Sequence, residues 1–254
     1  MHRRARTRFW GETMAEKIII ASGKGGVGKS SLTAGLSRAL TAMGKAVLVV
    51  DMDIGLRSLD LIFGVEKDMV FDWGNIVEEA CDPEQAIVKT DGPDLITAPM
   101  SVLPSYTPEA IRAFADKLDA AYDYILFDAP AGLAIGFELA CAAANRGIVV
   151  STPDEVCVRS VNLTAASIRR FGITDVRLVI NRFAQKAVRR GKLLNIDDVI
   201  DATCVRLVGI VPEDPTVSHC AVSGTPLPKS SVAARAFSRI AQRVNGASIP
   251  LFGA

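Results

Sequence analysis

Short, uniformly apolar runs alternate along the chain with segments whose apolar residues recur every three or four positions. The runs predict buried strands at Ile18–Ala21, Ala46–Val50, Tyr124–Asp128, Gly147–Ser151, Val176–Ile180 and Leu207–Val211. The longer segments predict helices, most clearly at Ser30–Met43, from Pro153 to Phe171 and at Val232–Val244. Strands that are buried on both faces and joined by helices pair in parallel. We therefore expect an α/β fold, a mostly parallel sheet with helices on both faces.

The pattern is weaker between residues 65 and 108. It predicts a helix over Phe71–Ala80, short strands at Ala86–Lys89 and Leu95–Ala98, and a loop from Pro99 to Pro108. Thr107 followed by proline is a typical start for the next helix. Further along, Asp197–Ala202 is expected to form one more short helix.

A glycine-rich loop follows the first predicted strand and matches the P-loop pattern G-x-x-x-x-G-K-[ST]. Glycines in such a loop let successive N–H groups turn toward phosphate oxygens, and the positive end of the next helix adds to that field. Lys29 would reach the β- and γ-phosphates of a nucleotide, and the Ser30 hydroxyl would bind Mg²⁺. A plain strand–helix turn is the alternative. The predicted nucleotide-binding residues of the loop are Gly23, Lys24, Gly25, Gly26, Val27, Gly28, Lys29, Ser30 and Ser31.

Carboxylates stand at the ends of two predicted strands, where ligands bind in open α/β sheets. Asp51 and Asp53 follow the second strand, and Asp128 ends the strand Y-I-L-F-D, which has the composition of a Walker B element. We expect Asp53 to orient the water that attacks ATP, and Asp51 and Asp128 to support Mg²⁺ with Ser30. The alternative for Asp53 is the cap of a short helix.

Lys24 is not explained by the general P-loop pattern. Two ammonium groups on the same phosphates would repel each other, so a second lysine is best placed if it points toward a nucleotide held by another copy of the chain. The segment K-G-G-V-G-K-S here resembles the deviant Walker A ATPases of the MinD/ParA family. That resemblance implies an ATP-dependent homodimer in which Lys24, with Lys29 and Asp53, serves catalysis.

Other segments carry the same resemblance over roughly residues 16–245. D-M-D-I-G-L-R-S-L-D-L-I-F-G resembles switch I of the MinD branch, except that Ser58 replaces its usual asparagine, and D-A-P-A-G resembles switch II. By resemblance, Asn181 reads the adenine edge, as its amide can both donate and accept, although an asparagine ending a strand is also a common turn former. The resemblance adds further nucleotide-binding residues: Arg182, Pro212, Glu213 and Asp214.

Composition and charge restrict the class of protein. The 254 residues are 49% apolar and 22% charged with a net charge of +1, so no overall basic field indicates nucleic acid. No apolar run approaches the ~18 residues that span a bilayer. The five cysteines are scattered and form no C-x-x-C pair, which favours a reducing cytosol and small buried thiols over disulfides or zinc.

Three basic segments leave alternatives open. Residues 1–13 carry four arginines and are expected to be a disordered extension before one ATPase domain at 14–254, with a basic arm as the alternative. Arg182–Lys192 reads as a solvated loop rather than a phosphate or lipid site. The last helix could lie at a membrane interface, but its arginine row fits better the outer face of a helix packed on the sheet.

The resemblance implies an ATPase that dimerises on Mg-ATP, turns over slowly until a MinC/MinE-like or other regulatory protein stimulates it, and helps to position the division septum. It implies a cytoplasmic protein, with only weak support for peripheral attachment to the inner face of the membrane, because no separate amphipathic tail is visible. Two alternatives remain. One is a ParA- or FlhG-type ATPase that positions DNA, flagella or other cargo, and the other is a scaffold that binds nucleotide without hydrolysing it.

Overall fold

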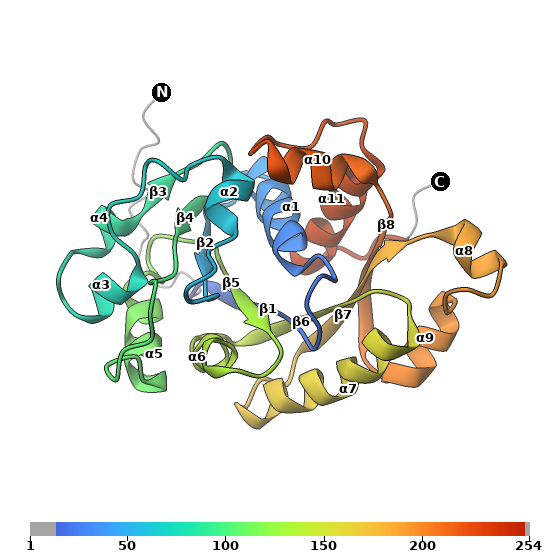
Figure 1. Cartoon of the computed structure of the whole chain (residues 1–254), viewed down its shortest axis with the longest axis horizontal. Coiled ribbons are helices and arrows are strands. Elements are labelled where there is room, and N and C mark those ends of the chain that lie inside the picture. The colour runs from blue at the N-terminus through green and yellow to red at the C-terminus, as the bar shows by residue number, and fades with distance from the viewer. Residues whose placement is uncertain (1–13, 252–254) are drawn as a thin grey trace.

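A single eight-stranded sheet runs through the computed structural model, which describes residues 14–251 (Figure 1). Its strand order is β3-β4-β2-β5-β1-β6-β7-β8, and every neighbouring pair is parallel except β3 and β4. The strands are β1 Glu16–Ser22, β2 Val47–Asp51, β3 Val88–Lys89, β4 Asp94–Ile96, β5 Tyr124–Ala131, β6 Arg146–Ser151, β7 Val176–Phe183 and β8 Arg206–Pro212. The predicted mostly parallel α/β fold is confirmed.

Helices cover both faces of this sheet (Figure 1). Consecutive residues of β1 show the reason, since Ile18 packs in one core cluster and Ile19 in the other. On one face lie α1 (Lys29–Ala42), α2 (Leu59–Phe63), α10 (Pro215–Val222) and α11 (Val232–Val244). On the other lie α3 (Trp73–Val77), α5 (Pro108–Lys117), α6 (Ile135–Ala143), α7 (Glu155–Arg170) and α9 (Ile196–Thr203).

Short capped segments account for the errors of the sequence-based assignment between residues 71 and 89. The strand expected at 86–89 is wrong at its start, because Ala86 ends the helical turn α4 (Pro83–Ala86), whose Asp82 cap is closed by Gln85. Only Val88–Lys89 is strand. The helix expected at 71–80 is shorter, since Glu79 has a left-handed φ of 58°.

Two expectations about exposed segments are partly corrected. The basic run after Asn181 forms one short helix, α8 (Gln185–Arg189), rather than a loop, although none of its residues is buried. Cys141, Cys157 and Cys220 are buried as expected, whereas Cys204 is exposed. It adopts the left-handed cap of α9, so its thiol is not a core group.

The last helix packs on the protein, as the preferred interpretation predicted. Phe237 and Ile240 of α11 are buried in the core cluster that includes α1, and Gly209 of β8 lies directly beneath Ile240. Its apolar face is therefore covered by the molecule. Among residues 14–251, no helix is both long and apolar enough to cross a bilayer.

Candidate functional site

The P-loop connects the end of β1 to α1, at the carboxyl edge of the sheet (Figure 1). Gly26 and Gly28 have φ angles of 80° and 88°, a left-handed conformation that side chains oppose. At Gly28 a Cβ would lie 2.3 Å from the amide nitrogen of Asn181, so close contact also requires glycine there. The Ser22 hydroxyl donates to the carbonyl of Lys24 at 2.9 Å and fixes the start of the loop.

Asp128 is the centre of a buried polar cluster beneath this loop. Its carboxylate accepts hydrogen bonds from Ser30 Oγ at 2.6 Å and Thr33 Oγ1 at 2.7 Å, and pairs with Lys29 Nζ at 3.3 Å. Asp128 itself is fully buried. Sequence analysis missed Thr33, although its position one helical turn after Lys29 places both on the same face of α1.

Asp51 lies beside Asp128, because the two residues are direct partners in the parallel pairing of β2 with β5. Its carboxylate accepts backbone N–H groups of Asp53 at 2.9 Å, Ser58 at 3.2 Å and Leu59 at 3.3 Å. Burial and the neighbouring Asp128 charge nevertheless raise the pKa of Asp51 to about 7. Two buried carboxylates thus lie side by side, and Lys29 pairs with only one of them, Asp128.

Asp53 and Ser58 belong to the loop after β2 and face the same cluster. Burial raises the pKa of Asp53, while the Lys29 ammonium lowers it, so the Asp53 carboxylate lies within the field of that lysine. The Ser58 hydroxyl donates to Ser30 Oγ at 3.3 Å. Ser58, which stands where the resembling MinD-branch sequences usually have asparagine, therefore contacts Ser30, the predicted magnesium ligand.

The oxygen donors of this cluster fit a magnesium ion. Ser30, Asp128 and Asp51 offer a hydroxyl and two carboxylates, and Mg²⁺ in nucleotide sites uses one or two carboxylates with waters and substrate phosphates. Within residues 14–251 no group of three or more His, Cys, Asp or Glu side chains could hold a metal by itself. The donor set therefore suits a metal that arrives with a nucleotide.

A cavity of ≈ 280 Å³ extends from the P-loop to the carboxyl ends of β7 and β8. Asn181 is buried there, and its Nδ2 donates to the carbonyl of Val27 at 2.7 Å. The structure brings together the predicted base-binding residues and adds four that sequence analysis missed. The cavity is lined by Gly28, Ser31, Asn181, Arg182, Val211, Pro212, Glu213, Asp214, Pro215, Val217 and Ser218.

Asp214 shapes one wall of this cavity. It caps α10 through the Thr216 amide at 3.0 Å and accepts the Ser231 hydroxyl, at the start of α11, at 2.6 Å. Partial burial would raise the pKa of Asp214, but these hydrogen bonds outweigh that effect and lower it to about 2. The Asp214 carboxylate thus links the start of α10 to the start of α11.

Lys24 lies apart from the cluster that holds Lys29. Its side chain is exposed, and its charge is felt at Asp154, the cap of α7. Partial burial would raise the pKa of Asp154, but hydrogen bonds from Thr152 and the Cys157 amide, with a smaller contribution from the Lys24 ammonium, lower it. The second lysine therefore faces the surface beside α7.

A glycine loop, a phosphate-directed lysine and paired oxygen donors at one sheet edge define a P-loop nucleotide-binding protein. The sequence profile of the CobQ/CobB/MinD/ParA nucleotide binding domain matches residues 18–227. Septum site-determining protein MinD of Bacillus subtilis is 36% identical over 247 residues, covering 94% of this chain and 92% of that protein. The chain belongs to the MinD family of septum site-determining proteins, a branch of the MinD/ParA nucleotide-binding ATPases.

Solved structures agree with this assignment. MinD in the MinC:MinD cell division complex of Aquifex aeolicus is 34% identical, with a TM-score of 0.87 over 94% of this chain and 99% of that chain. Septum site-determining MinD of Pyrococcus horikoshii, complexed with Mg-ADP, is 28% identical, with a TM-score of 0.80 over 92% of this chain and 97% of that chain. That relative holds Mg-ADP on the same fold.

Proposed function

We propose that this protein is a MinD-type ATPase switch for septum positioning, which closes into a homodimer on two Mg-ATP and reopens after hydrolysis. The position of Lys24 carries the proposal. Its ammonium is exposed and separate from the buried Lys29–Asp128 pair, so it is free to reach a nucleotide bound by a second copy. A cation supplied across an interface stabilises charge on the transferring phosphoryl group.

Within one subunit, the roles follow from the contacts of each side chain. Lys29 would exchange its 3.3 Å contact with Asp128 for the β- and γ-phosphates. Ser30, Asp128 and Asp51 would hold Mg²⁺, which when bound neutralises phosphate charge. Asp53, near that lysine, would orient the attacking water.

Asn181 would bind the adenine through one half of its carboxamide. Its NH₂ group already donates to the carbonyl of Val27, which leaves the carboxamide oxygen as an acceptor for the exocyclic amine of adenine. Arg182, Pro212 and Glu213 would enclose the base and ribose, since they line the same cavity.

Replacing Lys24 tests the proposal. We expect Lys24→Ala to abolish dimerisation with Mg-ATP and to lower ATP turnover by about 10²-fold or more, because charge stabilisation across the interface is lost. Affinity of the monomer for Mg-ADP should stay within a few-fold. Dimerisation is measured by sedimentation velocity and turnover by phosphate release.

Lys117→Ala is the matched control, because Lys117 is also an exposed lysine but ends α5 at the opposite edge of the sheet. It should behave as wild type. Unchanged dimerisation and turnover in Lys24→Ala would contradict the proposal.

Regulation is proposed by analogy with the Aquifex complex. A MinC-type protein would bind the ATP form, and a MinE-like or other regulatory protein would stimulate an otherwise slow turnover. Attachment of a cytoplasmic protein to the inner face of the cell membrane would be peripheral, and co-sedimentation of the full chain with anionic liposomes, with and without ATP, measures it. ATP-independent sedimentation, or none, would contradict a nucleotide-controlled membrane step.

Two other functions can be separated from this one. A ParA- or FlhG-type role on DNA is not favoured by the family assignment, and filter binding to duplex DNA would reveal it by a steep loss of affinity with salt. A scaffold that binds without hydrolysing would dimerise on ATP yet release no phosphate. The chain carries Lys24, Asp53 and Asp128, the residues to which the proposal assigns hydrolysis, and this speaks against a scaffold.

A further inference from the structure

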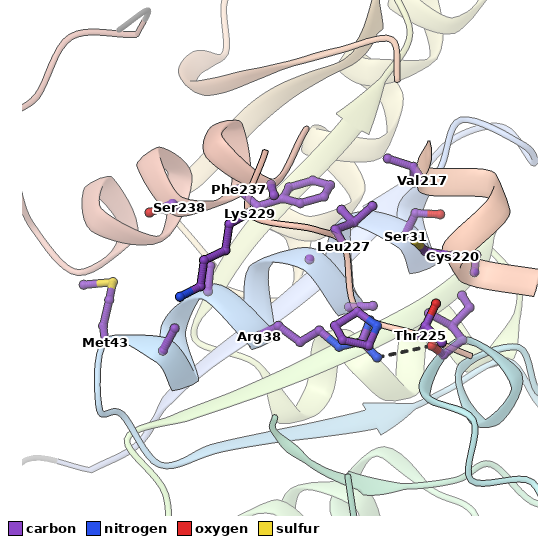
Figure 2. A pocket seen from close by; sticks show the side chains of 18 residues that line it. Ser31, Arg38, Met43, Val217, Cys220, Thr225, Leu227, Lys229, Phe237 and Ser238 are labelled. Atoms are coloured by element: carbon purple, nitrogen blue, oxygen red, sulfur yellow. Dashed lines mark hydrogen bonds between the residues drawn. The ribbon is translucent and has the colours of Figure 1, made fainter. Parts of the chain in front are cut away.

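A second cavity, of ≈ 330 Å³, lies beside the nucleotide cavity, between α1, α10, α11 and the loop at 225–229 (Figure 2). Ser31 and Val217 border both cavities. The walls of the second one are mainly apolar or small side chains. They include Ala39, Met43, Ile62, Val217, Leu227 and Phe237.

The space exists because the outer face of α1 is made of small residues. Ala34, Gly35, Ala39 and Ala42 all line the cavity. At Gly35 a Cβ would lie 2.2 Å from the ring of Phe237, so α11 approaches α1 closely at that point while the neighbouring turns stay open. Apolar clefts of about 300 Å³ or more are typical of ligand sites.

Arg38 is one of two cations that line this cavity, and Figure 2 shows its side chain extending toward Thr225. The guanidinium carbon lies 4.8 Å from the centre of the Phe63 ring. Within residues 14–251 the guanidinium makes one long hydrogen bond, from NH2 to the carbonyl of Ile62 at 3.4 Å. The buried Nε has no hydrogen-bond partner among the described residues, although buried polar atoms normally have one.

The charge of Arg38 is incompletely balanced by the protein. No aspartate or glutamate lines the cavity, and Lys229 adds a second cation. Burial lowers the pKa of Arg38, and the charge of Asp91 opposes only part of that effect. A buried guanidinium is best satisfied by a carboxylate or phosphate, which accepts two parallel N–H bonds.

We propose that this cavity binds a single-chain amphiphile with an anionic head, whose head pairs with Arg38 and whose alkyl chain lies against Leu227 and Phe237. The head could be the carboxylate of a free fatty acid or the phosphate of a lipid. Both present the same chemistry to the guanidinium, and the apolar walls exclude a small inorganic anion as the preferred ligand.

Calorimetric titration of the full chain, saturated with Mg-ADP to close the nucleotide cavity, tests this site. Decanoate and decyl phosphate are the anionic probes, and decyltrimethylammonium is the cationic one. We expect at least one anion to bind at least tenfold more tightly than the cation, and the tighter of the two identifies the head group. Equal binding of the cation, or no binding of any probe, would overturn the proposal.

Variants localise the binding. Arg38→Met should weaken anion binding by about tenfold, the value of one charge-assisted pair. Arg235→Met is the matched control, since Arg235 is an exposed arginine of α11 that does not line the cavity. Equal losses in the two variants would place the anion elsewhere and overturn the assignment.

Two further measurements keep the test independent of the stability of Arg38→Met. Ala39→Phe should fill the cavity and abolish binding while Mg-ADP affinity is retained. In the wild type, decanoate should slow alkylation of Cys220, a buried thiol that lines the cavity, relative to that of the exposed Cys204. Unchanged binding in Ala39→Phe, or unprotected Cys220, would contradict the proposed site.

Discussion

The amino and carboxyl edges of the sheet differ in their ratio of carboxylates to cations. At the amino edge two buried or half-buried cations each contact two carboxylates: Lys17 lies 2.5 Å from Asp116 and 2.9 Å from Asp119. Arg146 has the same arrangement, with Glu16 at 2.7 Å and Asp175 at 3.1 Å. At the carboxyl edge the ratio is inverted, because the buried carboxylates of Asp51 and Asp128 lie side by side and, of the two, only Asp128 contacts the ammonium of Lys29.

The direction of the pKa shifts shows what this difference means. Burial would lower the pKa of Lys17, but the hydrogen bonds that its ammonium donates to Asp116 and Asp119, together with their charges, outweigh that effect and raise the pKa, so the charged form is favoured. At the other edge the pKa of Asp51 rises to about 7, so its charged form is opposed. Paired charges at the amino edge stabilise the fold. Carboxylates without a matching cation, at an edge where ligands bind, indicate a site that a bound ligand completes.

The largest effect is expected from removing the Lys29 ammonium. Lys29→Met should lower ATP turnover by about 10³-fold, since the phosphates lose their point charge and Asp51 and Asp128 repel an unneutralised nucleotide. Phosphate release and titration with Mg-ATP would measure this loss. A variant that still turned over at a tenth of the wild-type rate would show that the carboxyl edge does not depend on Lys29.

The matching change at the amino edge should affect stability and spare the site. Lys17→Met should lower the free energy of unfolding by about 2 kcal/mol, because Asp119 and Asp116 lose a buried partner. Urea unfolding measures this loss, with Lys117→Met as the control for an exposed lysine. Mg-ADP affinity of the folded variant should remain that of wild type, and a large loss of affinity would contradict the division between the edges.

The smallest effect concerns pH in the protein without nucleotide or metal. Because the folded pKa of Asp51 is about 7 and its ordinary value is 3.8, the folded state binds the extra proton between these values, and stability falls as pH rises through that window. Asp51→Asn removes this dependence. The free energy of unfolding of Asp51→Asn, minus that of the wild type, should therefore rise by on the order of 2 kcal/mol from pH 5 to pH 8.

Urea unfolding at both pH values provides the measurement. Asp68→Asn serves as the control, since Asp68 is an exposed carboxylate outside the site. Parallel pH profiles for wild type and Asp51→Asn would show that Asp51 is ionised throughout.

The phosphate side of the site could be predicted from sequence because its residues are close together or end strands. The loop from Gly23 to Ser31 is continuous, and Asp51 and Asp128 meet because carboxyl ends of parallel strands share an edge. Even the position of Lys24, exposed and apart from Lys29, could be predicted from like-charge repulsion. The six apolar runs predicted six of the strands, because burial on both faces of a sheet leaves an uninterrupted apolar signal.

What could not be predicted depends on contacts between distant segments. Val217 and Ser218 enter the nucleotide cavity only because Asp214 ties the starts of α10 and α11 together. Short helices such as α2 and α4 have too few residues to show a helical period. The exposure of Cys204 reflects a left-handed cap, which composition does not reveal.

The ion pair between Lys29 and Asp128 has a consequence for the order in which the site fills. One carboxylate oxygen of Asp128 is occupied by the ammonium and by the Ser30 hydroxyl. A lone divalent cation would have to displace both, against the repulsion of a nearby positive charge. A triphosphate would draw the lysine away and free that oxygen in the same movement, so we expect the protein to bind magnesium only weakly until nucleotide and metal arrive together.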